Sequence, residues 1–147
     1  GKWFGRRYGN GLVEEYMCDG AEAVIVAMGT IASTARVAIR NLRKRDEPVG
    51  LVKLKSFKPF PAEEFRRIGP QVRAMGVVDR NISCGTGGIV FGNVRDAMYD
   101  LEERPRTLQF HAGLRGKEVK VTDIERIAGK TLRAARGEEV APLVEWV

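Results

Sequence analysis

Histidine and cysteine are scarce in this sequence, and their scarcity excludes several kinds of site. His111 is the only histidine, so no second one can complete a two-histidine metal site or a histidine relay. Cys18 and Cys84 are too few for an iron–sulfur cluster held by four thiolates, or for a zinc site built from cysteine. We expect no bound metal, two free buried thiols, and a structural or surface place for His111.

Long hydrophobic runs are also absent. The longest strongly apolar stretch, residues 23–28, is far shorter than the roughly 18 residues that a membrane span needs. The charged N-terminus, beginning Gly-Lys-Trp-Phe-Gly-Arg-Arg, is not followed by the apolar core of a secretory signal. We therefore expect a cytoplasmic protein with no membrane partner. Its first residue is glycine rather than methionine, so we also expect that sequence is missing upstream.

Charge of one sign does not dominate. The net charge is +6, but 19 acidic residues are interspersed among 25 basic ones. Small basic clusters occur at Arg36, Arg40, Arg43, Lys44 and Arg45, and at Lys53, Lys55 and Lys58. A basic face can meet nucleic acid, an acidic subunit or an anionic cofactor. No aromatic stacking platform accompanies these charges, so a solvated surface is favoured and nucleic acid is not expected.

The 147 residues, 44% of them hydrophobic, suffice for one globular domain that folds by itself. Short apolar runs alternate with amphipathic segments, which predicts a three-layer α/β/α fold with a mostly parallel, five-stranded sheet. The expected strands are 23–28, 49–57, 74–78, 107–110 and 119–121. We place a lead-in or inter-domain segment at 1–20, the α/β domain at 21–136 and a C-terminal tail at 137–147.

Helix boundaries carry their own signals. Thr30 and Ser33 are candidate caps for a helix over 30–45, and Gly69-Pro70 must break or kink a helix that opens at Pro61. Thr122-Asp123-Ile124-Glu125 predicts a capping box for the last helix.

A glycine-rich stretch, Gly85, Thr86, Gly87 and Gly88, lies between an expected strand and an expected helix. In an open α/β sheet this is a place where backbone N–H groups can bind an anion. The stretch does not complete the dinucleotide fingerprint, and the sequence has no Gly-Lys-Thr/Ser phosphate loop. The favoured interpretation is that these glycines let the chain turn and approach the sheet closely.

Three polar residues, Asp79, Arg80 and Asn81, follow the third expected strand. The carboxyl end of a strand is the edge where α/β proteins place ligands, which favours a functional site. An internal Asp79–Arg80 pair or an Asx turn that organises the glycine-rich loop is an equally good interpretation. No acid–base pair identifies itself by spacing, so the residues support a binding or assembly domain more than an independent enzyme.

Six segments in order carry a resemblance to a known family. They are 14–17, 21–30, 49–51, Phe57-Lys58-Pro59-Phe60-Pro61, Val77-Val78-Asp79-Arg80-Asn81, and 113–119 with Gly-Leu-Arg-Gly-Lys-Glu-Val. This series resembles domain II of the α subunit of pyruvate and related 2-oxoacid:ferredoxin oxidoreductases, over about residues 11–128. Arg115 stands where the resemblance leads us to expect glycine.

The resemblance implies a fold like the transketolase C-terminal domain, within an enzyme that decarboxylates a 2-oxoacid, pyruvate being the expected one, and forms an acyl-CoA. It implies that thiamine diphosphate, Mg and iron–sulfur clusters are bound elsewhere in the parent complex, and that ferredoxin and CoA meet this chain only through that complex. The chain alone is then a structural or assembly domain without catalytic residues.

Four aromatic residues in the expected lead-in, Trp3, Phe4, Tyr8 and Tyr16, follow no helical or strand period. Aromatic residues outside the core pattern are enriched at interface centres, so we expect them to dock on neighbouring domains or subunits. For Tyr16, packing on its own domain is an equal alternative. Two other functions stay open: the equivalent domain of a transketolase or oxoacid dehydrogenase β subunit, and a stand-alone basic nucleotide-binding module.

Overall fold

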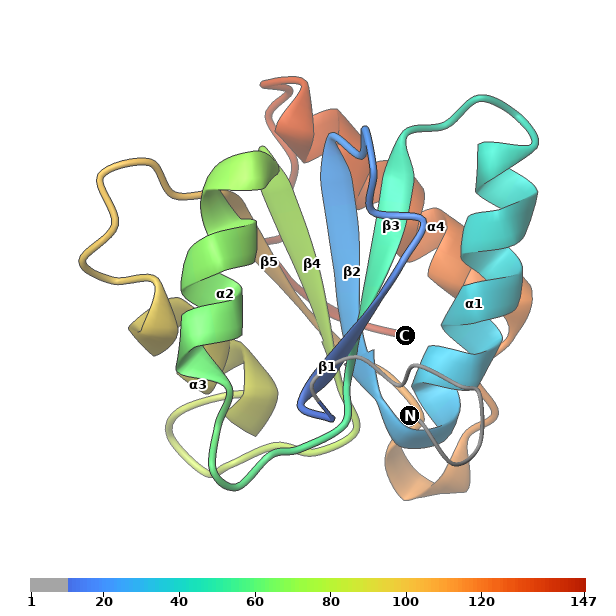
Figure 1. Cartoon of the computed structure of the whole chain (residues 1–147). Helices are drawn as coiled ribbons and strands as arrows, with labels where there is room; N and C mark the ends of the chain where they lie inside the picture. Colours follow the sequence, from blue (N-terminus) through green and yellow to red (C-terminus); the bar gives the residue numbers. More distant parts are fainter. Residues whose placement is uncertain (1–10) are drawn as a thin grey trace, which may run out of the picture.

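A computed structural model describes residues 11–147 and shows one six-stranded sheet in the order β1-β3-β2-β4-β5-β6 (Figure 1). The strands are β1 (Val13–Tyr16), β2 (Ala23–Met28), β3 (Val49–Leu54), β4 (Ala74–Asp79), β5 (Arg106–His111) and β6 (Val144–Trp146). The strand β1 pairs antiparallel with β3, and all other neighbours are parallel. The α/β fold with a mostly parallel sheet is confirmed.

Two pairs of helices cover the two faces of this sheet (Figure 1). The helices are α1 (Gly29–Arg43), α2 (Ala62–Ile68), α3 (Ile89–Ala97) and α4 (Val121–Ala135). Ile25 lies in the core under α1 and α4, whereas its neighbours Val24 and Val26 lie in the core under α2 and α3. Because successive side chains of a strand point to opposite faces, β2 is buried on both sides and shows no polar alternation.

The sheet corrects the expected strand count and puts strands outside the expected domain boundaries. Residues 119–121 are not a strand: residues 119 and 120 lead into α4, which begins at Val121, and Val119 packs at the edge of the core. The strands β1 and β6 lie in the segments expected to be lead-in and tail. Boundaries at 21 and 136 therefore leave two strands of the sheet outside the domain. Edge strands this short bury few residues and give little periodic signal.

The helix ends differ in detail from the sequence expectation. Neither Thr30 nor Ser33 caps α1, since the residue before its first turn is Met28 and no side chain caps the amides there. The last helix begins at Val121, and Asp123 accepts a hydrogen bond from the Lys120 amide at 2.9 Å, two residues before the expected cap. The break at Gly69-Pro70 is confirmed, because α2 ends at Ile68 and a 3-10 turn follows.

Candidate functional site

The point where the strand order reverses lies between β2 and β4. The chain leaves β2 toward β3 on one side and returns to β4 on the other, so the loops after β2 and β4 diverge there. Open α/β sheets bind ligands at such a point, beyond the carboxyl ends of the strands. A hollow of about 330 Å³ lies here, lined by residues 28–31, 78–81 and Val90. It includes all three strand-end residues that the sequence indicated.

Asp79 does not face this hollow as a free carboxylate. Its side chain is 1% exposed, and its two oxygens accept hydrogen bonds from the amides of Val90 at 2.9 Å and Phe91 at 3.1 Å. These amides belong to the first turn of α3, where no helical partner is available to them. Burial raises the pKa of Asp79, while the two amides and nearby His111 act to lower it. Asp79 therefore caps α3 from a neighbouring strand.

Asn81 completes the same cap. Its side-chain oxygen accepts a hydrogen bond from the Ile89 amide at 3.2 Å. The first three amides of α3 thus all donate to Asp79 or Asn81. These are the groups that an anion bound at the glycine-rich stretch would need. The structure gives them an internal partner and supports the structural interpretation of Gly85, Thr86, Gly87 and Gly88.

The glycines bring this loop against the sheet. A Cβ added to Gly88 would lie 2.1 Å from Oδ2 of Asp79, so only glycine lets the loop reach the carboxylate. Gly87 has φ +84° and lies against Gln109, whose Nε2 would be 2.8 Å from an added Cβ. A side chain at either position would therefore clash with its neighbour in the sheet. At Gly87, the positive φ also favours glycine.

Arg80 corrects the expected pairing with Asp79. Its Nη1 donates to the Thr30 hydroxyl at 3.0 Å, and no ion pair joins it to Asp79. Adjacent residues at a strand end project in opposite directions, so the carboxylate turns to α3 and the guanidinium to α1. The polar cluster thus divides into an internal cap and an exposed cation.

Two buried polar side chains lie behind the cap, and the sequence analysis singled out His111 but not Gln109. His111 is 2% exposed; its Nδ1 lies 3.2 Å from the Asn81 carbonyl oxygen and its Nε2 lies 3.0 Å from Gln109 Nε2. Because the carbonyl can only accept, Nδ1 carries the proton and Nε2 accepts from the amide. The ring of Trp146 lies 4.7 Å from that of His111. The structural place expected for His111 is confirmed.

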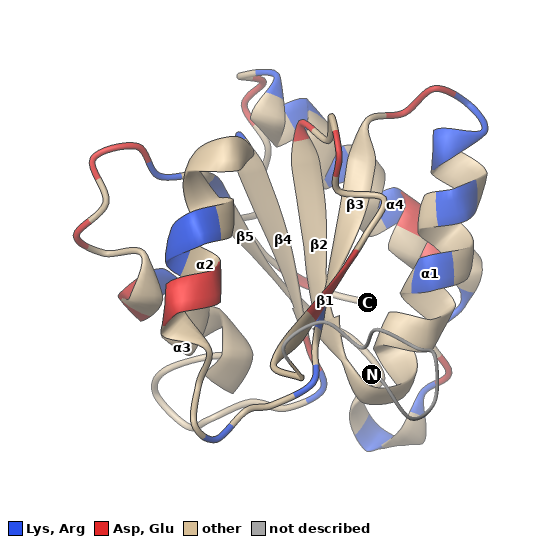
Figure 2. Cartoon of the chain, in the orientation of Figure 1, with Lys and Arg blue, Asp and Glu red and all other residues tan. Residues whose placement is uncertain are grey.

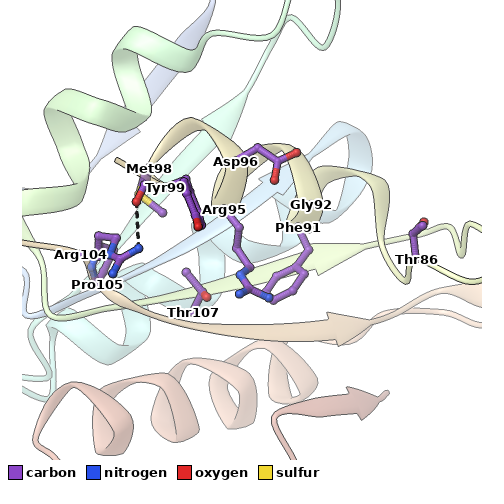
Figure 3. A pocket seen from close by; sticks show the side chains of 10 residues that line it. All are labelled: Thr86, Phe91, Gly92, Arg95, Asp96, Met98, Tyr99, Arg104, Pro105 and Thr107. Atoms are coloured by element: carbon purple, nitrogen blue, oxygen red, sulfur yellow. Dashed lines mark hydrogen bonds between the residues drawn. The ribbon is translucent and has the colours of Figure 1, made fainter. Parts of the chain in front are cut away.

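A second hollow, of about 570 Å³, follows α3 on the side of β5 (Figure 3). Its wall includes Phe91, with the Arg95 guanidinium 5.5 Å from the ring, and its floor includes Thr107. Arg104 lies at one end of the hollow and donates to the Tyr99 carbonyl at 2.8 Å (Figure 3). These groups offer contacts to a ligand or partner but no nucleophile activated by a base.

The remaining predicted residues are placed as follows. Tyr16 packs on its own domain, with the Arg36 guanidinium 4.7 Å from its ring, so the alternative to docking is supported there. Trp3, Phe4 and Tyr8 lie outside the described residues. Both cysteines are free, but only Cys18 is partly buried, whereas Cys84 is exposed.

Arg115 shows why the resemblance expects glycine at its position. Its φ of 55° is in the left-handed region, which glycine adopts without strain. Within residues 11–147, no three His, Cys, Asp or Glu side chains gather closely enough to hold a metal ion. No helix in the same residues is long and apolar enough to cross a membrane.

The sheet order and the helix layers define an α/β domain, and the superpositions show that its fold is transketolase-like. A split-gene transketolase, as an inactive β4 tetramer, superposes with a TM-score of 0.64 at 18% identity, covering 87% of this chain and 43% of that one. A 2-oxoglutarate:ferredoxin oxidoreductase from Magnetococcus marinus gives a TM-score of 0.62 at 17% identity, covering 85% and 20%. The model of pyruvate:ferredoxin oxidoreductase core domain II matches residues 21–124. The chain belongs to that family.

Curated relatives agree with this family. The pyruvate synthase subunit PorA of Methanothermobacter thermautotrophicus is 38% identical over 144 residues, covering 98% of this chain and 34% of that subunit. The ketoisovalerate oxidoreductase subunit VorA of Pyrococcus abyssi is 34% identical over 149 residues, covering 99% and 38%. The chain spans about a third of the length of these relatives.

Proposed function

We propose that this chain is a non-catalytic assembly domain of a thiamine-diphosphate-dependent 2-oxoacid:ferredoxin oxidoreductase that forms an acyl-CoA. The observation that supports the proposal is that the polar residues at the end of β4 form hydrogen bonds within the domain itself. Asp79 and Asn81 hold the first turn of α3, so the position where an open α/β sheet would bind a ligand serves the domain's own fold.

The parts needed for redox chemistry are proposed to lie elsewhere in the parent enzyme. The two cysteines of the whole chain cannot supply the four thiolates of an iron–sulfur cluster. No phosphate-binding loop is present for a diphosphate. We assign thiamine diphosphate, Mg and the clusters to other domains or subunits, together with the contacts to ferredoxin and CoA, in a cytoplasmic complex.

The substrate acid belongs to the parent enzyme and not to this domain. The relatives are named for two different acids, as pyruvate synthase and ketoisovalerate oxidoreductase subunits. Since similar chains occur in enzymes for different acids, substrate choice is proposed to rest with the two thirds of the subunit that this chain does not match. Pyruvate stays the first acid to test.

The test is an activity assay of the purified chain against the assembled parent enzyme. Each is given thiamine diphosphate, Mg, CoA and a viologen dye, with pyruvate, 2-oxoglutarate or ketoisovalerate as substrate. The chain alone should reduce no dye and bind no thiamine diphosphate in calorimetry, whereas the assembled enzyme should turn over one of the acids. Dye reduction by the chain alone would show that it carries catalytic groups of its own and would refute the proposal.

A further inference from the structure

Basic and acidic residues are concentrated in the loops at opposite ends of the strands (Figure 2). The strands β2 to β5 are parallel, so the loops that follow them share the carboxyl edge of the sheet. Loops 55–61, 80–88 and 112–120 at this edge have a basic excess. They contain six basic residues, Lys55, Lys58, Arg80, Arg115, Lys117 and Lys120, and one acidic residue, Glu118.

The opposite edge has an acidic excess. The loops that precede β2 to β6 contain nine acidic residues, Asp19, Glu22, Asp46, Glu47, Asp100, Glu102, Glu103, Glu138 and Glu139, and five basic residues, Lys44, Arg45, Arg73, Arg104 and Arg136. The net charge of +6 is therefore not spread evenly, and the carboxyl edge presents a positive field to any partner.

Three exposed apolar side chains lie at the loops of the basic edge, while Met17, Tyr99 and Leu143 are exposed at the opposite edge. Met28, Ile82 and Ile89 are 38%, 46% and 39% exposed, and they follow β2, follow β4 and open α3 at that edge. Together with Arg80 they form what we call the Arg80 patch. The 330 Å³ hollow opens at this patch, with Val78 and Val90 in its lining. An arginine among apolar neighbours is a composition typical of interface centres.

Arg80 is held in place without a carboxylate. Its guanidinium donates to the Thr30 hydroxyl, and none of the ion pairs found within residues 11–147 includes it. The same side chain also lines a further hollow of about 260 Å³, together with Lys117 and Glu118. The guanidinium thus borders both the largely apolar 330 Å³ hollow and this charged one, and keeps donors for an incoming acceptor.

We propose that the Arg80 patch docks an acidic surface of the remaining part of the same subunit, and that this contact joins the domain to its enzyme. An aspartate or glutamate of that surface pairs with Arg80, and an apolar side chain beside it enters the 330 Å³ hollow. The basic loops around the patch select an acidic partner over a neutral one. This inference rests on the proposed assembly role and assigns it to one face.

The test measures binding of the chain to its parent subunit produced without this segment. Arg80→Glu reverses the central charge, and Ile82→Asp changes the apolar rim while leaving the Arg80–Thr30 hydrogen bond intact. The matched control is Arg73→Glu, which makes the same charge change at an exposed residue of the acidic edge. We expect the dissociation constants of the two patch variants to be larger by about tenfold or more. The dissociation constant of the control should stay close to that of the unmodified chain. Binding of the unmodified chain should also weaken as salt is raised.

Three outcomes would count against the inference in different ways. Tight binding by both patch variants would overturn the Arg80 patch and leave the assembly role standing. Absence of binding by the unmodified, folded chain would overturn both. Saturable binding of inorganic phosphate, lost in Arg80→Glu while subunit binding is unchanged, would assign Arg80 to a small anion and overturn the docking role. Thermal unfolding of each variant shows that the compared chains are folded.

Discussion

The carboxylate of Asp79 occupies the space that a side chain on Gly88 would need, since an added Cβ would lie 2.1 Å from Oδ2. This contact joins the end of β4 to the start of α3, and it explains why polar residues and glycines occur together here. The carboxylate needs a close backbone approach to reach two amides of the first helical turn.

Replacing Gly88 by alanine should destabilise the domain by about 1–3 kcal/mol, because the new methyl group displaces the buried carboxylate. The matched control is Gly92→Ala inside α3, where an added Cβ would meet nothing within 4 Å. That variant should be more stable by about 0.5–1 kcal/mol, since alanine favours the helix. Urea unfolding measures both. Equal effects of the two changes would show that the loop does not approach Asp79 closely.

Asp79→Ala should lower the free energy of unfolding by about 1–3 kcal/mol, because two amides of α3 lose their acceptor. Asp79→Asn keeps one acceptor oxygen and should lose less. Asp96→Ala, an exposed aspartate of the same helix, is the control and should change stability by at most about 0.5 kcal/mol. An unchanged thermal midpoint for Asp79→Ala would contradict the cap.

The pH dependence of Asp79 should have the sign of a buried acid. Burial raises its pKa above the usual 3.8, so the folded state binds the proton more readily than the unfolded state. The part of its stabilisation that is linked to protonation is therefore fully present below pH 3.8 and lost as pH rises through the folded pKa, while the two amide hydrogen bonds remain. Relative to Asp79→Asn, the unmodified chain should lose stability over that interval in urea unfolding. A gain would mean that the amides outweigh burial.

Glu145 in β6 should show the opposite pH dependence. Burial acts to raise its pKa, but Lys130, whose Nζ lies 2.7 Å from Oε2, and Arg126 outweigh burial and hold the pKa below the usual 4.5. The stabilisation is present above pH 4.5 and lost as pH falls through the folded pKa. Glu145→Gln should cost about 1 kcal/mol at neutral pH and little at low pH. Glu139→Gln, at an exposed residue, is the control.

The two thiols should differ widely in reactivity. Burial raises the pKa of the Cys18 thiol to about 11, so almost no reactive thiolate forms at pH 8. Cys84 lies exposed in the glycine-rich loop. Iodoacetamide should therefore label Cys84 first, as mass spectrometry of the digested chain can show, and Cys84→Ser should remove the fast labelling. Fast labelling at Cys18 would indicate that β1 opens from β3.

The sequence by itself determined the central strands and their helices. The apolar run 23–28 matches β2 in both bounds. A strand that is buried on both faces is a continuous apolar run, which is visible in the sequence without knowing its neighbours. The break at Gly69-Pro70 follows from proline's missing donor, which is a local property. The family resemblance also rested on short segments whose order the sequence displays, and the family is confirmed over residues 21–124.

Only the tertiary structure decided which strands pair at the sheet edges and which side chains form hydrogen bonds with each other. The edge strands β1 and β6 form because an open sheet edge accepts them, and their own residues carry little periodic signal. Asp79 and Arg80 look like a pair in sequence, yet the alternation of a strand turns one to α3 and the other to α1. Hydrogen-bond partners are set by packing between elements far apart in the chain, so the division of this polar cluster into an internal cap and an exposed cation is a property of the fold.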